Sequence, residues 1–363
     1  MMARPCRIVL LAWLCWAAAA APADSLTTVA GDGTKGFGGD GGPAPAAQLA
    51  DPGGIARGPD GALYICDTAN HRLRRVTPDG RITTVAGTGV AGWTADGAVG
   101  TATQLNEPYE VRFDPAGNPV WVERRNHTVR MLDQATGRVR TLAGKGTPGF
   151  AGDGGPAPEA QLREPHSIAF DATGNLYIAD VLNHRIRRVD RSGGVIRTFA
   201  GTGEKRLPRD GESLTTAPLF GPRALDFDRA GRLWVALREG NVLLAIDPAA
   251  GVVQWRAGTG RKGPGGDGGP ARAADLTGPK GVSAAPDGKI YFADTESHTI
   301  RRFDPVRDIV ERVAGDGTRG DGPDGDPLHG RLARPHGVFV DRDGAVYIGD
   351  TEAQRVRVLR PGL

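Results

Sequence analysis

The stretch Leu63-Tyr64-Ile65-Cys66-Asp67 recurs along the chain and decides its fold. Its five further copies are Val120-Trp121-Val122-Glu123, Leu176-Tyr177-Ile178-Ala179-Asp180, Leu233-Trp234-Val235-Ala236-Leu237, Ile290-Tyr291-Phe292-Ala293-Asp294 and Val346-Tyr347-Ile348-Gly349-Asp350. The last residues of successive copies are 56 or 57 positions apart, and unrelated segments would not keep that spacing. Self-similarity at a fixed period indicates a repeat architecture.

Each repeat contains four short strand candidates separated by turns. In the first repeat these are residues 54–57, 62–66, 72–77 and 82–86, and Asp60-Gly61 and Asp79-Gly80 are hairpin-forming dipeptides between them. A four-stranded unit repeated six times predicts an all-β, six-bladed β-propeller with four-stranded blades. A solenoid is the alternative, but it would need atypical polar repeats at its ends, and none is visible.

The ring is expected to close through its N-terminal strand. The fourth strand of a repeat ends in a tail such as Thr83-Thr84-Val85-Ala86-Gly87, and the sixth repeat lacks this tail because the sequence stops at Leu363. The missing copy, Leu26-Thr27-Thr28-Val29-Ala30-Gly31, stands at the other end. We therefore expect residues 26–31 to complete the sixth blade and to pair its open edge.

Residues 1–23 resemble a secretory signal peptide. Arg4 and Arg7 precede an apolar stretch over residues 8–21, and Ala21-Pro22-Ala23 has the small-residue pattern of a cleavage site. We expect cleavage after Ala23, which leaves residues 24–363 as a single propeller that is exported to the periplasm or out of the cell. An uncleaved anchor is the alternative, although the apolar stretch is short for a membrane span.

Composition and charge exclude several classes of protein. The chain has 55 Gly and 27 Pro among 363 residues, so long helices are nearly excluded. Loss of residues 1–23 would leave 43 basic and 42 acidic residues, which argues against a nucleic-acid partner. Neither a membrane partner after signal cleavage nor oligomerisation is indicated, and we expect a monomer. Only Cys66 would remain as a thiol, and we expect it to be a small buried residue.

The turns after the recurring stretch carry a family resemblance. They read Asn70-His71-Arg72-Leu73, Asn126-His127-Thr128-Val129 and Asn183-His184-Arg185-Ile186, with weaker copies at residues 297–300 and 353–356 and a degenerate one at 240–243. The chain resembles the NHL-repeat family, named for Asn-His-Leu, over residues 26–361. The resemblance implies a six-bladed propeller of the secreted, bacterial type. It says little about chemistry, because that family includes binding modules, sensor domains and a few enzymes.

Features that repeat around the ring are expected to build the blades. We expect His71, His127, His184 and His298 to donate hydrogen bonds that hold the turn, and the preceding acids to cap it. The arginines of the third strands are expected to cover neighbouring blades and to pair with acids. Each 22-residue linker carries an Asp-Gly pair, which we interpret as a loop cap; calcium binding there is the alternative.

Positions that differ between repeats are the better candidates for function. The residue after the linker proline opens the innermost strand at the mouth of the channel, and in chain order it is Gly53, Tyr109, His166, Arg223, Lys280 and His336. Glu110 follows Tyr109, where other blades have a small residue. We predict that Tyr109, Glu110, His166, Arg223, Lys280 and His336 bind a ligand. The expected partner is an unidentified anionic small molecule, glycan or protein at this face.

A propeller lyase or lactonase acting on an anionic substrate at the same face is the alternative function. His166, His336 and Glu110 would then supply the catalytic groups, because each type can act as a base or as a ligand. The resemblance also covers the amidating lyase, which uses three channel histidines for zinc, but only two non-motif histidines fall on inner strands here. The Glu, Asn and Asp ligand set of gluconolactonase-like propellers has no clear match. We therefore predict no metal site and no cofactor.

Overall fold

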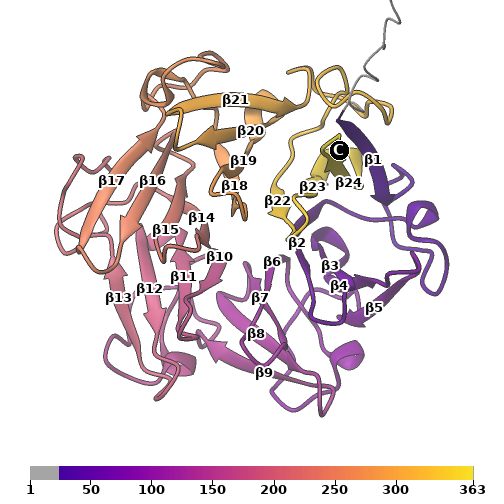
Figure 1. Ribbon diagram of the computed structural model, residues 1–363. Helices are drawn as coiled ribbons and strands as arrows, with labels where there is room; N and C mark the ends of the chain where they lie inside the picture. The colour runs from indigo at the N-terminus through magenta and orange to yellow at the C-terminus, as the bar shows by residue number, and fades with distance from the viewer. Residues whose placement is uncertain (1–23, 363) are drawn as a thin grey trace, which may run out of the picture.

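The computed structural model describes residues 24–362, so the predicted signal peptide lies outside the described residues. Six four-stranded antiparallel sheets surround a common centre, and Figure 1 shows them as a closed ring. The predicted six-bladed β-propeller is therefore confirmed. The first strands of neighbouring blades contact one another, which makes them the innermost strands.

The strands follow the repeat closely. Blade 1 is β2 (Pro52–Arg57), β3 (Leu63–Asp67), β4 (Arg72–Val76) and β5 (Ile82–Ala86); blade 2 is β6 (Pro108–Phe113), β7 (Pro119–Glu123), β8 (Thr128–Asp133) and β9 (Arg138–Ala143); blade 3 is β10 (Pro165–Phe170), β11 (Leu176–Asp180), β12 (Arg185–Val189) and β13 (Ile196–Ala200). Blade 4 is β14 (Pro222–Phe227), β15 (Leu233–Leu237), β16 (Val242–Asp247) and β17 (Val252–Ala257); blade 5 is β18 (Pro279–Ala284), β19 (Ile290–Asp294), β20 (Thr299–Asp304) and β21 (Ile309–Ala314); blade 6 is β22 (Gly337–Val340), β23 (Val346–Asp350), β24 (Arg355–Arg360) and β1 (Ser25–Ala30).

Short 3-10 helices occur at two kinds of place. Four lie in the linkers: η1 (Ala44–Ala46), η3 (Gly100–Ala102), η4 (Ala157–Glu159) and η6 (Ala271–Ala273). Four follow a second strand: η2 (Thr68–Asn70), η5 (Val181–Asn183), η7 (Thr295–Ser297) and η8 (Thr351–Ala353). Among residues 24–362, no helix is long and apolar enough to cross a membrane.

The N-terminal strand closes the ring as predicted. Strand β1 pairs antiparallel with β24, with Leu26 opposite Leu359, and Figure 1 shows the first strand beside the last. The Leu26 side chain is fully buried between blades 5 and 6. This pairing covers the edge of β24, which would otherwise present unpaired backbone groups.

Second strands are buried on both faces, which explains their continuous apolar sequence. Cys66 is fully buried on β3, as predicted, and burial raises the pKa of its thiol well above the usual value. The same position in blade 6 is Gly349, where an added Cβ atom would lie 2.5 Å from the carbonyl oxygen of Gly53. Close packing against Gly53 therefore leaves no room for a side chain at Gly349.

Five blades contain a fully buried arginine on the third strand. Each pairs with the acid that ends the second strand and with an aspartate of the linker. In blade 3, for example, Arg187 lies 2.5 Å from Asp153 and 3.4 Å from Asp180. The prediction that these arginines pair with nearby acids is confirmed. Blade 4 has Leu237 and Leu244 at the two positions, and both pack in an apolar cluster.

The repeated histidines hold the ring together, but in a different way from the prediction. The Nδ1 atom of His71 accepts a hydrogen bond from the backbone N–H of Glu107, in the entry to the next blade. His127, His184 and His298 make the equivalent bond. The expectation that the histidines donate was therefore wrong: they accept, because the lone pair of a neutral ring faces the next blade.

The linker aspartates cap loops, as predicted. Asp153 accepts hydrogen bonds from the backbone N–H and the hydroxyl of Thr198 at the fourth strand of its own blade. Asp96 binds Thr141 in the same way. Asp40, Asp210 and Asp324 make equivalent contacts, so in five blades the linker is held to the outermost strand.

Candidate functional site

A bulge at the start of five of the six first strands places the variable residue outside the ladder; in blade 6 the variable residue, His336, immediately precedes β22. In β10, Pro165 pairs with Asp180 and Ser167 pairs with Ala179, so His166 stands outside the ladder. The register shifts at the equivalent place in β2, β6, β14 and β18. A bulge of this kind bends the strand and re-aims a side chain. In these five blades the bulge thus separates the residue after the linker proline from the regular ladder.

A cavity of about 560 Å³ opens at this mouth. It is lined by four of the predicted residues, Tyr109, Arg223, Lys280 and His336. The cavity is also lined by residues from the linkers and from the turns after the second strands: Lys35, Asp51, Thr68, Ala69, Glu107, Arg124, Arg319, Arg334, Thr351, Glu352 and Gln354. The structure therefore brings four of the six predicted residues together, from blades 2, 4, 5 and 6.

These four side chains form a continuous chain of hydrogen bonds. Arg223 donates to the Tyr109 hydroxyl at 2.9 Å, and that hydroxyl lies 3.3 Å from Nδ1 of His336. Nε2 of His336 lies 2.9 Å from Nζ of Lys280. Whichever ring nitrogen carries the proton, His336 connects Lys280 to Tyr109. The chain links blades on opposite sides of the ring across the mouth.

The charge of the cavity is predominantly positive. Six cationic side chains and three carboxylates line it. Lys280 lies 3.4 Å from Glu296, and that same carboxylate lies 2.7 Å from Arg334. Arg223 is different, because no carboxylate in residues 24–362 pairs with it and its Nε is buried without a hydrogen-bond partner. Such a cavity attracts an anion.

Burial and neighbouring cations alter the protonation of the mouth residues. Burial, followed by the positive charge of Arg223, lowers the pKa of Lys280 to about 7. Burial also lowers the pKa of His336 well below its usual value, with the Lys280 charge as the next cause. His336 is therefore a neutral imidazole at pH 7, and Lys280 exchanges between ammonium and amine.

His166 supports the cavity from behind. It is buried, and its Nδ1 lies 2.8 Å from the carbonyl oxygen of Glu164. The rings of His166 and Tyr109 pack edge to face, with their centroids 4.8 Å apart. Its Nε2 has no hydrogen-bond partner within the described chain. Burial lowers the pKa of His166 well below its usual value, so this ring is neutral as well.

Glu110 belongs to a different cluster. Its carboxylate lies 2.5 Å from the guanidinium of Arg112, and burial raises the pKa of the Glu110 carboxyl to about 7. The Asp226 carboxylate, on β14 of blade 4, also raises the pKa of Glu110. None of these three residues lines the mouth cavity. His166, His336 and Glu110 are therefore not brought into one pocket.

Several residues of the cavity were missed from the sequence. Arg334 precedes a linker proline, and Arg124 and Glu352 follow second strands. The repeats differ in charge at the residue before the linker proline. They also differ in charge at the two residues that follow the second strand. These differences are a signal for the site that is visible in the sequence.

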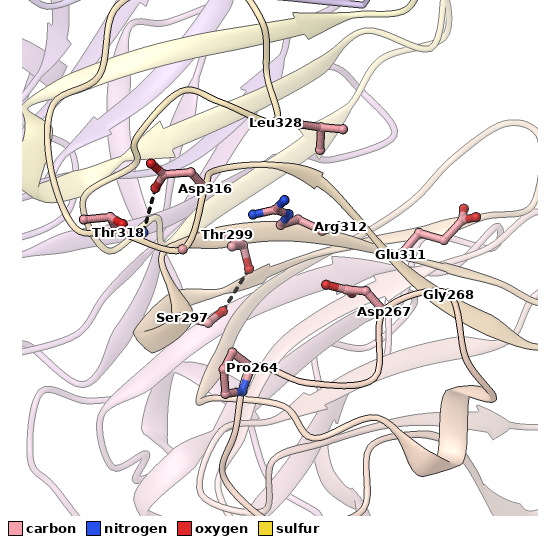
Figure 2. A pocket seen from close by; sticks show the side chains of 11 residues that line it. Pro264, Asp267, Gly268, Ser297, Thr299, Glu311, Arg312, Asp316, Thr318 and Leu328 are labelled. Carbon is pink, nitrogen blue, oxygen red and sulfur yellow. Dashed lines mark hydrogen bonds between the residues drawn. The ribbon is translucent and has the colours of Figure 1, made fainter.

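A second cavity, of about 600 Å³, lies at blade 5 and contains none of the predicted residues (Figure 2). Pro264 and Thr299 line it. In blade 3 the equivalent pair is Phe150 and Arg185, and the guanidinium lies 3.9 Å from the ring centroid. Blade 5 has lost this stacked pair, which leaves space above Ser297.

Within residues 24–362, no group of three or more His, Cys, Asp or Glu side chains is arranged to hold a metal ion. The mouth presents six cations, three carboxylates, the Tyr109 hydroxyl and a neutral imidazole. These groups can bind an anion and can move a proton between neighbouring atoms.

Sequence comparisons identify related repeats. Residues 49–76 and 332–359 match the family model of the NHL repeat, and residues 146–211 match that of the teneurin NHL domain. The chain is 28% identical over 265 residues to Protein SUPPRESSOR OF QUENCHING 1, chloroplastic, of Arabidopsis thaliana, covering 70% of this chain and 25% of the relative. It is 26% identical over 330 residues to human NHL repeat-containing protein 2, covering 82% of this chain and 44% of the relative. The chain thus spans less than half of either relative.

Solved structures share the fold. An auxiliary nutrient binding protein from Bacteroides thetaiotaomicron is similar, with a TM-score of 0.69 and 17% identity over 94% of this chain and 77% of that chain. A catalytically inactive virginiamycin B lyase from Staphylococcus aureus has a TM-score of 0.52 and 16% identity, over 86% of this chain and 82% of that chain. At these identities the likeness concerns the fold alone.

Proposed function

The chain belongs to the NHL-repeat family, and from the cavity at the mouth of its ring we propose that it is an exported binding module for a small anionic molecule. The observation that carries this proposal is Arg223, a half-buried guanidinium at the mouth without a carboxylate partner in the described chain. Leaving such a charge unpaired is costly, so a ligand carboxylate or phosphate would gain a charge-assisted hydrogen bond there. The cavity volume of about 560 Å³ is in the usual range for small-molecule sites.

Export and monomeric state belong to the same proposal. Residues 1–23 have the order of a signal peptide, and cleavage after Ala23 would deliver residues 24–363 to the periplasm or to the outside of the cell. A similar fold occurs in a protein described as an auxiliary nutrient binding protein, which supports a role in capturing a solute. The nearly neutral mature charge disfavours nucleic acid as the partner.

Calorimetric titration of the secreted protein with monocarboxylates, dicarboxylates and phosphate esters tests the proposal. Arg223→Gln should weaken the binding of any anion that the wild type binds by about tenfold to a hundredfold, since a hydrogen bond to a charged group contributes about 1.5–3 kcal/mol. Arg312→Gln is the matched control, because Arg312 lines the other cavity. Equal affinity for wild type and Arg223→Gln, or no binding of any anion, would contradict the proposed function.

A lyase or lactonase is the second candidate, favoured by the link from Lys280 through His336 to the Tyr109 hydroxyl. A neutral imidazole between two protic groups can accept one proton and deliver another. The fold of a virginiamycin B lyase supports this alternative. Turnover of a bound anion that is abolished in His336→Gln, with binding retained, would favour the enzyme; binding without turnover would favour the module.

A further inference from the structure

Lys280 differs from the other five lysines of the chain. Its side chain is 4% exposed, whereas Lys35, Lys145, Lys205 and Lys262 are exposed and Lys289 is half-buried. The Pro279-Lys280 position opens β18, so the amine stands on a rigid strand at the mouth rather than on a loop. Burial of a lysine at a cavity wall disfavours its charged form.

The surroundings of the Lys280 amine also favour the uncharged form. Nζ lies 2.9 Å from Nε2 of His336 and 3.4 Å from Glu296, its single carboxylate contact within the described chain. The charges of Arg223, Arg334 and Arg238 oppose protonation, and the Glu296 carboxylate is shared with Arg334. The pKa of Lys280, about 7, results from this balance. A desolvated lysine beside other cations is an activated nucleophile.

We propose that Lys280 forms an imine with the carbonyl group of a 2-oxo carboxylate bound at the mouth. The inference deepens the proposed function and rests on it, since it names the class of anion. The carboxylate would pair with the guanidinium of Arg223, which has no acid partner in the described chain and stands at the same position of the neighbouring first strand. A carbonyl carbon next to that carboxylate is then presented to the amine.

The reaction balances without an oxidant, a reductant or a cofactor. The Nζ lone pair forms a bond to the carbonyl carbon, and the carbonyl π electrons move to oxygen, which takes a proton to give a carbinolamine. Nitrogen gives up one proton, which balances the proton taken by oxygen. The hydroxyl takes a second proton, the C–O bond breaks and water leaves, while the Nζ lone pair closes the C=N bond to give the protonated imine. Loss of the remaining N–H proton returns the second proton and leaves the neutral imine. His336 lies next to Nζ and connects it to the Tyr109 hydroxyl, so it is placed to carry these protons.

Reductive trapping on the wild-type protein tests the imine directly. The protein is incubated with pyruvate, 2-oxoglutarate or phenylpyruvate and sodium cyanoborohydride, and the modified lysines are mapped by peptide mass spectrometry. Lys280 should be labelled by at least one of these acids, at least tenfold faster than Lys35. Lys35 is the internal control, because it lines the same cavity but is exposed and pairs with Asp51. Labelling spread equally over the lysines, or absent from Lys280, would overturn the proposal.

Two further measurements separate this inference from the proposed function. Lactate and 2-hydroxyglutarate keep the carboxylates of pyruvate and 2-oxoglutarate but have no carbonyl group. Binding of hydroxy and oxo acids without trapping at Lys280 would refute the imine and leave the binding module intact; binding of neither, nor of any other anion, would refute both. Lys280→Arg keeps a cation at the mouth, and its circular dichroism should match the wild type while trapping at residue 280 is lost.

Discussion

The Nδ1 atom of His184 accepts a hydrogen bond from the backbone N–H of Gly221, 3.2 Å away, and thereby joins blade 3 to blade 4. The same bond recurs at every junction of the ring. At two junctions another side chain replaces histidine. Oδ1 of Asn241 accepts the hydrogen bond from the backbone N–H of Gly278, and Oε1 of Gln354 accepts it from the backbone N–H of Asp51. Histidine, asparagine and glutamine share an acceptor at a suitable distance from the backbone. The motif histidine therefore has a structural role: it accepts a hydrogen bond between neighbouring blades and is not part of a ligand site.

Two replacements of His184 should distinguish the energetic contribution of the hydrogen bond from that of the rest of the side chain. His184→Ala leaves the buried N–H of Gly221 without a partner and should lower the free energy of unfolding by about 1–3 kcal/mol. His184→Asn should cost less, because Asn241 makes the bond in the next blade and asparagine tolerates the same left-handed backbone. Urea unfolding measures both variants. Equal losses would show that the hydrogen bond does not matter.

The stability of the ring should depend on pH through the same histidine. Burial lowers the pKa of His184 in the folded state, with the Lys205 charge as the next cause. The unfolded chain therefore binds a proton first, and the contribution of His184 is present above pH of about 6.5 and is lost as pH falls below it. The free energies of unfolding of wild type and His184→Asn should accordingly differ most at pH 8, and the difference should shrink toward pH 5. Buried carboxylates titrate in both proteins and cancel in this comparison. A difference that is constant across this range would contradict the assignment.

The buried pair of Asp180 and Arg187 should be replaceable only as a pair. Asp180→Leu removes the fully buried one of the two carboxylates that pair with Arg187 and should cost about 3–5 kcal/mol. The double variant Asp180→Leu/Arg187→Leu should recover more than half of that loss, because blade 4 already packs Leu237 and Leu244 at the two positions. A double-mutant cycle from urea unfolding measures the coupling. Additive losses would contradict the pairing.

Removal of residues 24–31 should open the ring. The deletion uncovers the edge of β24 and removes the fully buried Leu26, so the melting temperature should fall by more than 10 °C. The matched control rejoins residues 24–31 behind residue 362 through a short turn, which the hydrogen bond from the Gly362 N–H to Asp24 makes feasible. This permuted chain should melt close to the wild type. An unchanged melting temperature of the deletion variant would refute closure by β1.

Much of the fold could be predicted from the sequence because it is local and repeated. The strands follow from short apolar runs between Asp-Gly turns, and the closure follows from one displaced copy of a strand. The role of the motif histidine could not be predicted in detail, since its partner lies about 37 residues away in the next blade. The candidate site was predicted in part: Tyr109, Arg223, Lys280 and His336 meet, while His166 lies behind them and Glu110 pairs with Arg112.

The sequence by itself determined the number of blades, their strands and the position on each blade that faces the mouth of the channel. These properties depend on periodicity and turn chemistry, which are written along the chain. Which side chains contact one another across the mouth depends on the tertiary structure, because the distances across a ring are set by how the six blades close. Closure brings Lys280, His336, Tyr109 and Arg223 into one hydrogen-bonded chain and leaves Arg223 without an acid. That arrangement, rather than any motif, defines the candidate site.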